Sequence, residues 1–130
     1  MSYYSLLGFQ FEDTIHNLIS HCGYKVLREK EIVGKYGSIA NGIDHLILTE
    51  HFVITIQDKW KKSKPTLQDA NHFIKASERI SNIEGKNYLG IYISKMPLTS
   101  YAIKAFEFDN TYSSNKFCSI HSEIVDDIEK

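Results

Sequence analysis

The end of one apolar run carries side chains that are unusual for a buried strand. Residues 53–56 (VITI) are followed directly by Gln57, Asp58 and Lys59. Because residues two apart in a strand share a face, we expect Gln57 and Lys59 to point to one side and Asp58 to the other. Asp44 begins the preceding apolar run, and antiparallel pairing of the two runs would bring its carboxylate close to Gln57 and Lys59.

A carboxylate, an amide and a lysine at one edge of a sheet suit the hydrolysis of a phosphodiester. Mg²⁺ prefers oxygen ligands, and Asp44, the amide oxygen of Gln57 and the backbone carbonyl of Asp58 offer three of them. The cation would activate water and neutralise charge at the phosphorus, and Lys59 would orient the water or stabilise the pentavalent centre. Taken singly, Asp44 also fits a turn residue, and Gln57 and Lys59 fit an ordinary strand end that reaches solvent.

The elements expected to position these residues alternate between helix and strand. Apolar residues spaced by threes and fours predict a helix from Leu7 to Cys22 that ends at Gly23. A short strand is expected over 24–29, a glycine-bearing loop over 33–42, and a hairpin from the runs 43–48 and 52–59. Further on, the pattern predicts a helix from Pro65 to Gly85, a strand over 88–94, a helix from Thr99 or Ser100 to Phe106, a strand over 117–120 and a C-terminal helix over 122–130. This order predicts one α/β domain over residues 1–130, with a central mixed sheet flanked by helices.

Glu12 lies on or beside the apolar stripe of the first helix. At 100° per residue it projects within about 20° of Ile19, on the side expected to face the sheet. A carboxylate there needs a partner. Two interpretations stay open: an edge carboxylate that pairs with His16 one turn later, and a contributor to the same metal site as Asp44.

These motifs together resemble the PD-(D/E)XK nuclease superfamily. The first helix carries FE at 11–12, a GY-x-V motif follows at 23–26, and GID at 42–44 precedes the strand that ends in Q-x-K at 57–59. The Q-x-K combination is most similar to the Mrr-type branch, and the GS pair at 37–38 is similar to archaeal-type Holliday junction resolvases. The resemblance covers residues 8 to about 94.

This resemblance implies a restriction-endonuclease-like three-layer sandwich and a magnesium-dependent endonuclease that acts on DNA, with Mn²⁺ able to substitute. It implies that Asp44 is the main metal ligand, Gln57 a second ligand or water-positioning group, Lys59 the catalytic lysine and Glu12 an auxiliary ligand. Glutamine carries no negative charge, so Gln57 would hold Mg²⁺ less strongly than glutamate. A catalytically inactive module that binds nucleic acid or a protein is therefore the alternative.

A cluster of lysines follows the proposed site. Trp60 is flanked by Lys59, Lys61, Lys62 and Lys64. Lys61, Lys62 and Lys64, together with Ser38, are expected to contact a nucleic-acid backbone. Trp60 fits either stacking on a base or packing into the core. A duplex has two strands and one chain offers one site, so a homodimer is expected.

The overall composition sets few further limits. The net charge is −1 and Arg28 and Arg79 are the only arginines, so a nucleic-acid partner must be met by a local patch. The two cysteines form no zinc-type grouping, and no segment approaches a membrane span or a secretory signal. A soluble, intracellular protein with reduced thiols is expected.

Overall fold

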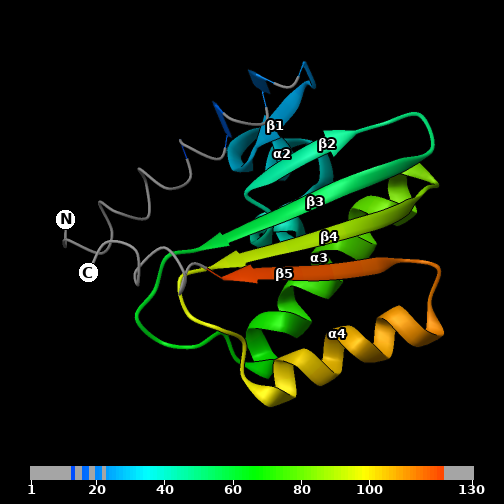
Figure 1. Ribbon diagram of the computed structural model, residues 1–130. Helices are drawn as coiled ribbons and strands as arrows, with labels where there is room; N and C mark the ends of the chain where they lie inside the picture. The colour runs from blue at the N-terminus through cyan, green and yellow to red at the C-terminus, as the bar shows by residue number, and fades with distance from the viewer. Residues whose placement is uncertain (1–12, 14–15, 18–19, 22, 122–130) are drawn as a thin grey trace.

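A five-stranded mixed sheet forms the centre of the computed structural model, which describes residues 13, 16–17, 20–21 and 23–121 (Figure 1). The first three strands in the order β1-β2-β3-β4-β5 are antiparallel neighbours, and β3, β4 and β5 run parallel. The prediction of an α/β fold with a central mixed sheet is therefore confirmed. The strands are β1 (Val26–Arg28), β2 (His45–Leu48), β3 (Phe52–Lys59), β4 (Asn87–Ser94) and β5 (Lys116–His121).

The predicted hairpin is formed by β2 and β3. Leu46 pairs with Thr55 and His45 with Ile56, so the two strands have the antiparallel register that the alternation of residues indicated. At the turn, Oγ1 of Thr49 accepts a hydrogen bond from the backbone N–H of Phe52 at 3.1 Å. This turn fixes the register and thereby decides which side chains share a face at the far end of the hairpin.

Two long helices cross from β3 to β4 and from β4 to β5. Helix α3 (Leu67–Glu84) begins after Thr66, whose side chain accepts from the N–H of Asp69, and ends at Gly85 in the left-handed conformation. The end was predicted correctly, but Pro65 precedes the capping residue instead of occupying the first turn. Helix α4 (Ser100–Tyr112) is capped by Thr99 and continues six residues beyond the predicted end at Phe106.

The stretch 33–42 is not the loop that its glycines suggested. Helix α2 (Glu29–Tyr36) covers its first part, and a 3-10 helix, η1 (Ser38–Gly42), covers the rest. Gly37 joins them with a φ of 94°, which favours glycine. The α2 helix is held by distant contacts, because the Tyr36 hydroxyl donates to Glu84 of α3 at 2.5 Å.

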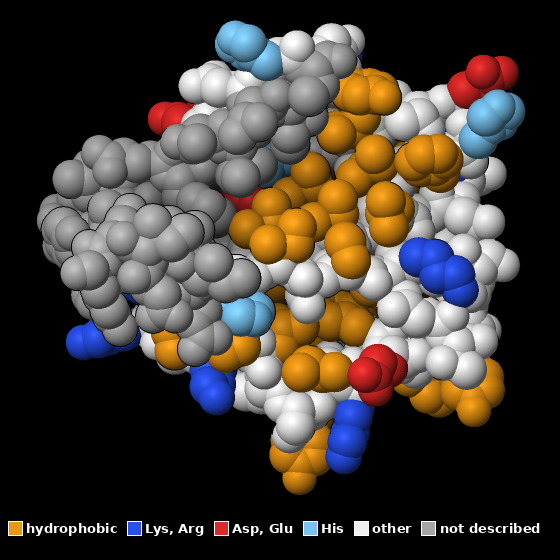
Figure 2. All heavy atoms as spheres, in the orientation of Figure 1, with side chains coloured by type: hydrophobic (Ala, Val, Ile, Leu, Met, Phe, Trp, Pro, Cys, Tyr) orange, Lys and Arg blue, Asp and Glu red, His pale blue; other side chains and the backbone are white. Residues whose placement is uncertain are grey.

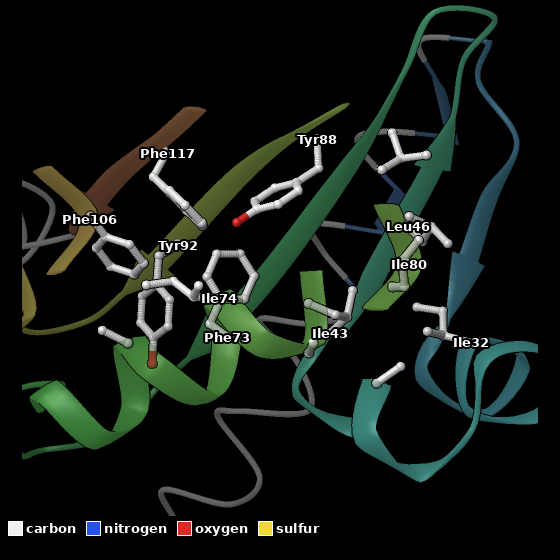
Figure 3. Close-up of a cluster of buried hydrophobic side chains, with 14 of the residues drawn as sticks. Ile32, Ile43, Leu46, Phe73, Ile74, Ile80, Tyr88, Tyr92, Phe106 and Phe117 are labelled. Atoms are coloured by element: carbon white, nitrogen blue, oxygen red, sulfur yellow. The ribbon is translucent and has the colours of Figure 1, made fainter. Parts of the chain in front are cut away.

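The main hydrophobic core lies between one face of the sheet and the helices α2, α3 and α4 (Figure 3). Phe73 of α3 stands at its centre. Its ring packs edge-on against Tyr92 of β4, with centroids 5.4 Å apart, and against Phe117 of β5 at 5.8 Å. Such aromatic pairs stabilise the fold beyond the area they bury, so they fix α3 firmly against β4.

The opposite face of the sheet is also apolar along its middle (Figure 2). Val26, Ile47 and Ile56 are buried there, and Ile54, Ile91 and Ile93 pack beside them. Of the predicted first helix, the described residues are helical, and the ring of His16 lies 6.1 Å from that of His45 on this face. The other residues of the predicted first helix, on which the expected third layer depends, and the predicted C-terminal helix lie outside the described residues. Among those that are described, no helix is long and apolar enough to cross a membrane.

Candidate active site

Asp44 and Gln57 meet directly beyond the last paired residues of β2 and β3, His45 and Ile56. The carboxylate of Asp44 is almost buried, with 7% of the residue exposed. Its Oδ2 atom accepts a hydrogen bond from Nε2 of Gln57 at 2.9 Å and another from the backbone N–H of Asp58 at 2.7 Å. The same Gln57 nitrogen lies 3.4 Å from the carbonyl oxygen of Asp58. The geometry expected from the alternation of β3 therefore brings these three groups together.

Lys59 lies on the same face of β3, two residues further along. Its ammonium is 3.4 Å from Oδ1 of Asp69, in the first turn of α3. A pocket of about 280 Å³ opens beside this pair. The residues that line it are Asn41, Gly42, Gln57, Lys59, Asp69, His72 and Tyr92. Asp44 is linked to the pocket through its hydrogen bond to Gln57.

The residues from η1 and α3 close one side of the pocket. Nε2 of His72 donates to Oδ1 of Asn41 at 2.9 Å. A Cβ atom on Gly42 would lie 2.4 Å from the His72 ring, so glycine at this position allows η1 to approach α3 closely. In the GID motif, Gly42 thus allows η1 to pack against α3, and Asp44 supplies the carboxylate that contacts Gln57.

Asp69 has two tasks, because it holds Lys59 and caps α3. Burial alone would raise its pKa. Hydrogen bonds from Thr66 and the charge and hydrogen bond of Lys59 outweigh burial, and the pKa of the carboxyl falls below its ordinary value of 3.8. The ionised form of Asp69 therefore stabilises the folded chain at neutral pH.

This predicts a specific acid dependence of stability. A carboxyl with a lowered pKa in the folded state contributes stability above its unfolded pKa, and this contribution is lost as the pH falls through the folded pKa. We expect Asp69→Asn to lower the free energy of unfolding by about 1 kcal/mol at pH 7. The difference from wild type should shrink below pH 3.8, as measured by urea unfolding across a pH series.

Asp109→Asn is the matched control for this experiment. Burial raises the pKa of the Asp109 carboxyl, so ionised Asp109 does not stabilise the fold. Asp109→Asn should therefore keep the loss of stability in acid that Asp69 causes. A constant difference between wild type and Asp69→Asn from pH 7 down to pH 2.5 would contradict the predicted role of Asp69.

Asp58 turns to the opposite face of β3, as the alternation indicated, and forms a buried pair there. Its Oδ2 accepts a hydrogen bond from Nε2 of His45, and the side chains of His45 and Asp58 are 0% and 3% exposed. Burial raises the pKa of the Asp58 carboxyl, and the hydrogen bond and charge of His45, with the charge of Arg28, offset this only in part. In the sequence, His45 directly follows Asp44, and Asp58 directly follows Gln57.

The other predicted site residues have different positions. Lys61, Lys62 and Lys64 are exposed in the segment between β3 and α3, next to Lys59. Ser38 is exposed at the start of η1, whose last residues line the pocket. Trp60 is partly buried, and Lys95 lies over its ring at 5.5 Å. Glu12 lies outside the described residues.

Several residues of the pocket were not predicted from the sequence. Asp69 and His72 are three apart in the first turns of α3, and the T-x-x-D pattern at 66–69 is a helix-start signal that could have drawn attention to them. No sequence pattern near Tyr92 or Asn41 indicates a site. Tyr92 reaches the pocket through the pairing of β4 with β3, and Asn41 reaches it through the packing of η1 on α3.

Metal-binding side chains are sparse around the pocket. Within residues 23–121 and the few described positions before them, no group of three or more His, Cys, Asp or Glu side chains is arranged to hold a metal ion. Any cation at this place would rely on Asp44 together with neutral oxygens such as those of Gln57 and the Asp58 backbone.

Comparison with known proteins finds two solved structures that are similar to part of this chain. No family model matches the chain, and no curated protein matches it. A repair endonuclease from Pyrococcus abyssi is similar over 61% of this chain and 32% of its own length, with 17% identity and a TM-score of 0.46. The structure of the EndoMS–dsDNA2 complex is similar over 61% of this chain and 30% of its own, with 16% identity and a TM-score of 0.46. The chain thus spans about a third of the length of each.

Proposed function

We propose that the chain is a metal-dependent endonuclease that hydrolyses DNA phosphodiester bonds, with structure-selective or weakly sequence-specific cleavage, and that it acts as a homodimer. The observation that carries this proposal is the nearly buried Asp44 carboxylate, hydrogen-bonded to Gln57 and to the Asp58 backbone, beside a pocket that also holds Lys59. The order of these residues also matches the nuclease motifs that the sequence resembles.

The oxygen donors at this place fit a hard divalent cation. The side-chain nitrogen of Gln57 donates hydrogen bonds to both Asp44 Oδ2 and the Asp58 carbonyl oxygen. These two oxygens therefore already point toward the same place. With its amide turned over, so that the oxygen takes the place of the nitrogen, Gln57 would join Asp44 and the Asp58 carbonyl in holding Mg²⁺ or Mn²⁺. When bound, such an ion supplies an activated water and neutralises charge on the phosphate.

The chain's own residues would then orient the substrate. Lys59 presents an ammonium to the pocket, where it would pair with a phosphate oxygen or hold the attacking water. Asp69 keeps that ammonium near the lining while no substrate is bound. The exposed lysines at 61, 62 and 64 would extend the positive charge beyond Lys59 for contact with a DNA backbone.

The direct test is a nuclease assay on linear, nicked and branched DNA with Mg²⁺ and with Mn²⁺. The proposal expects metal-dependent cleavage of at least one of these substrates that EDTA stops. An inert wild-type protein on all of them, at a concentration where it binds DNA, would argue against the enzyme.

A specific observation favours a second candidate, a nuclease-like module that binds DNA without cutting it. Two donors of the chain itself satisfy Asp44 Oδ2, and Lys59 pairs with Asp69. The polar groups are therefore stable together without an ion. In this case the lysines between β3 and α3 would be the functional residues.

The double variant Lys61→Ala/Lys62→Ala is expected to weaken DNA binding under either candidate. Removing two phosphate contacts should lower the slope of log affinity against log salt by about 2. Fluorescence anisotropy with a labelled duplex at several salt concentrations measures this. Lys30→Ala/Lys75→Ala, which removes two exposed lysines of α2 and α3, is the charge-matched control. Equal slopes for both double variants would show that charge alone, and not the 61–64 segment, decides binding.

A further inference from the structure

Tyr92 brings a hydroxyl into the pocket that no other described residue engages. The residue is 1% exposed, and its hydroxyl oxygen has no hydrogen-bond partner in the part of the chain that the structure describes. Buried polar groups are nearly always hydrogen-bonded, because an unpaired one costs free energy. Tyr92 also lines the pocket, and because its hydroxyl oxygen is itself buried, a ligand would reach it at the bottom of the pocket, where the lining must give way slightly.

The sheet places Tyr92 beside Gln57, and both residues line the pocket. Tyr92 is the partner of Gln57 in the parallel register of β3 and β4, so both side chains lie on the same face. Its ring is held in the aromatic core, and the hydroxyl is at the end of the ring that points away from Phe117 (Figure 3). The core therefore sets the position of the oxygen with little freedom.

The electrostatic surroundings keep Tyr92 a donor. Burial raises the pKa of its phenol, and the negative charges of Asp69 and Asp44 raise it further. A phenol keeps its proton at neutral pH even at its ordinary pKa, so the hydroxyl is a donor there. Asp44 and Asp69 only accept hydrogen bonds when ionised, so an anionic ligand in this pocket needs donors such as Tyr92 and Lys59.

We propose that Tyr92 is a substrate-contact residue whose hydroxyl donates a hydrogen bond to a non-bridging phosphate oxygen of the bound DNA strand. This rests on the proposed function, because it takes the pocket to be the place where the phosphodiester binds. Lys59 provides the charge for the same phosphate, and Tyr92 provides a directed neutral donor from the opposite strand of the β3–β4 pair.

Tyr92→Phe tests this with the loss of one oxygen atom and no change to the packed ring. We measure the affinity for a labelled duplex by fluorescence anisotropy in Ca²⁺, and single-turnover cleavage in Mg²⁺. Losing one neutral hydrogen bond to the phosphate should weaken binding about three- to tenfold. Tyr88→Phe removes the hydroxyl of another buried tyrosine of β4 that does not line the pocket, and it should bind like wild type.

The two measurements separate this inference from the proposed function. Weaker binding by Tyr92→Phe and not by Tyr88→Phe supports the contact, whether or not the wild-type protein cleaves DNA. Absent cleavage by wild type overturns the endonuclease and leaves the binding result to decide on Tyr92. Binding by Tyr92→Phe within twofold of wild type, with thermal unfolding unchanged, overturns the contact.

Discussion

Asp44→Asn is expected to reduce DNA cleavage by at least about a thousandfold in Mg²⁺ and in Mn²⁺. Among the described groups proposed to hold the cation, Asp44 carries the only negative charge, and the substitution removes it. It keeps a carbonyl oxygen that can still accept from Gln57 and from the Asp58 N–H, so the hydrogen bonds at 2.9 and 2.7 Å can persist. The fold should therefore survive, with a change of about 1 kcal/mol or less in the free energy of unfolding.

Calorimetric titration with Mn²⁺ gives the same variant a readout besides activity. Wild type should bind the ion and Asp44→Asn should not, while Asp109→Asn, which changes a carboxylate away from the pocket lining, should bind like wild type. Cleavage by Asp44→Asn at the wild-type rate would remove this residue from the site. Absent metal binding by wild type, even with DNA present, would favour the non-catalytic module.

The period-two alternation of strands explains why part of the site could be predicted from the sequence. It placed Gln57 and Lys59 on one face and Asp58 on the other, and the antiparallel hairpin placed Asp44 opposite Gln57. These relations depend only on residues close in sequence and on one short turn. Local geometry is sufficient for them.

The remaining part of the pocket depends on contacts between distant segments. Tyr92 lies beside Gln57 only through the parallel register of β3 and β4, and the whole of α3 separates these two strands in the sequence. Helix α2 was missed for a related reason. Its own sequence contains Gly34, a poor helix former, and its support comes from Tyr36 bonding to Glu84, 48 residues later.

The His45–Asp58 pair was invisible for a different reason. The alternation showed that Asp58 faces away from the site, but it gave no partner for the carboxylate, and a solvated strand end would have been an equally good outcome. The structure instead buries Asp58 against the residue that follows Asp44 on the neighbouring strand. The polar end of β3 thus carries hydrogen-bonded groups on both faces of the sheet.

Asp58→Ala is expected to destabilise the fold by about 3 kcal/mol, because it leaves the fully buried His45 without the acceptor for its Nε2 hydrogen. Urea unfolding measures this loss. Asp58→Asn is the matched control, since its amide oxygen can still accept from His45, and it should cost about 1 kcal/mol. Equal stabilities of the two variants would show that the hydrogen bond to His45 contributes little.

Asp58→Ala should also disturb the groups around Asp44 on the opposite face of the sheet. The backbone N–H of Asp58 holds Asp44 Oδ2, and the Asp58 carbonyl lies beside Gln57, so the side-chain anchor to His45 fixes the peptide groups on which the proposed cation site depends. Removing an anchor of this kind commonly weakens metal binding tenfold or more. We therefore expect Mn²⁺ to bind about tenfold more weakly to Asp58→Ala than to Asp58→Asn, at temperatures where both are folded. If the two variants bind Mn²⁺ equally while differing in stability, His45 and Asp58 support the fold alone and leave the geometry around Asp44 to the hairpin.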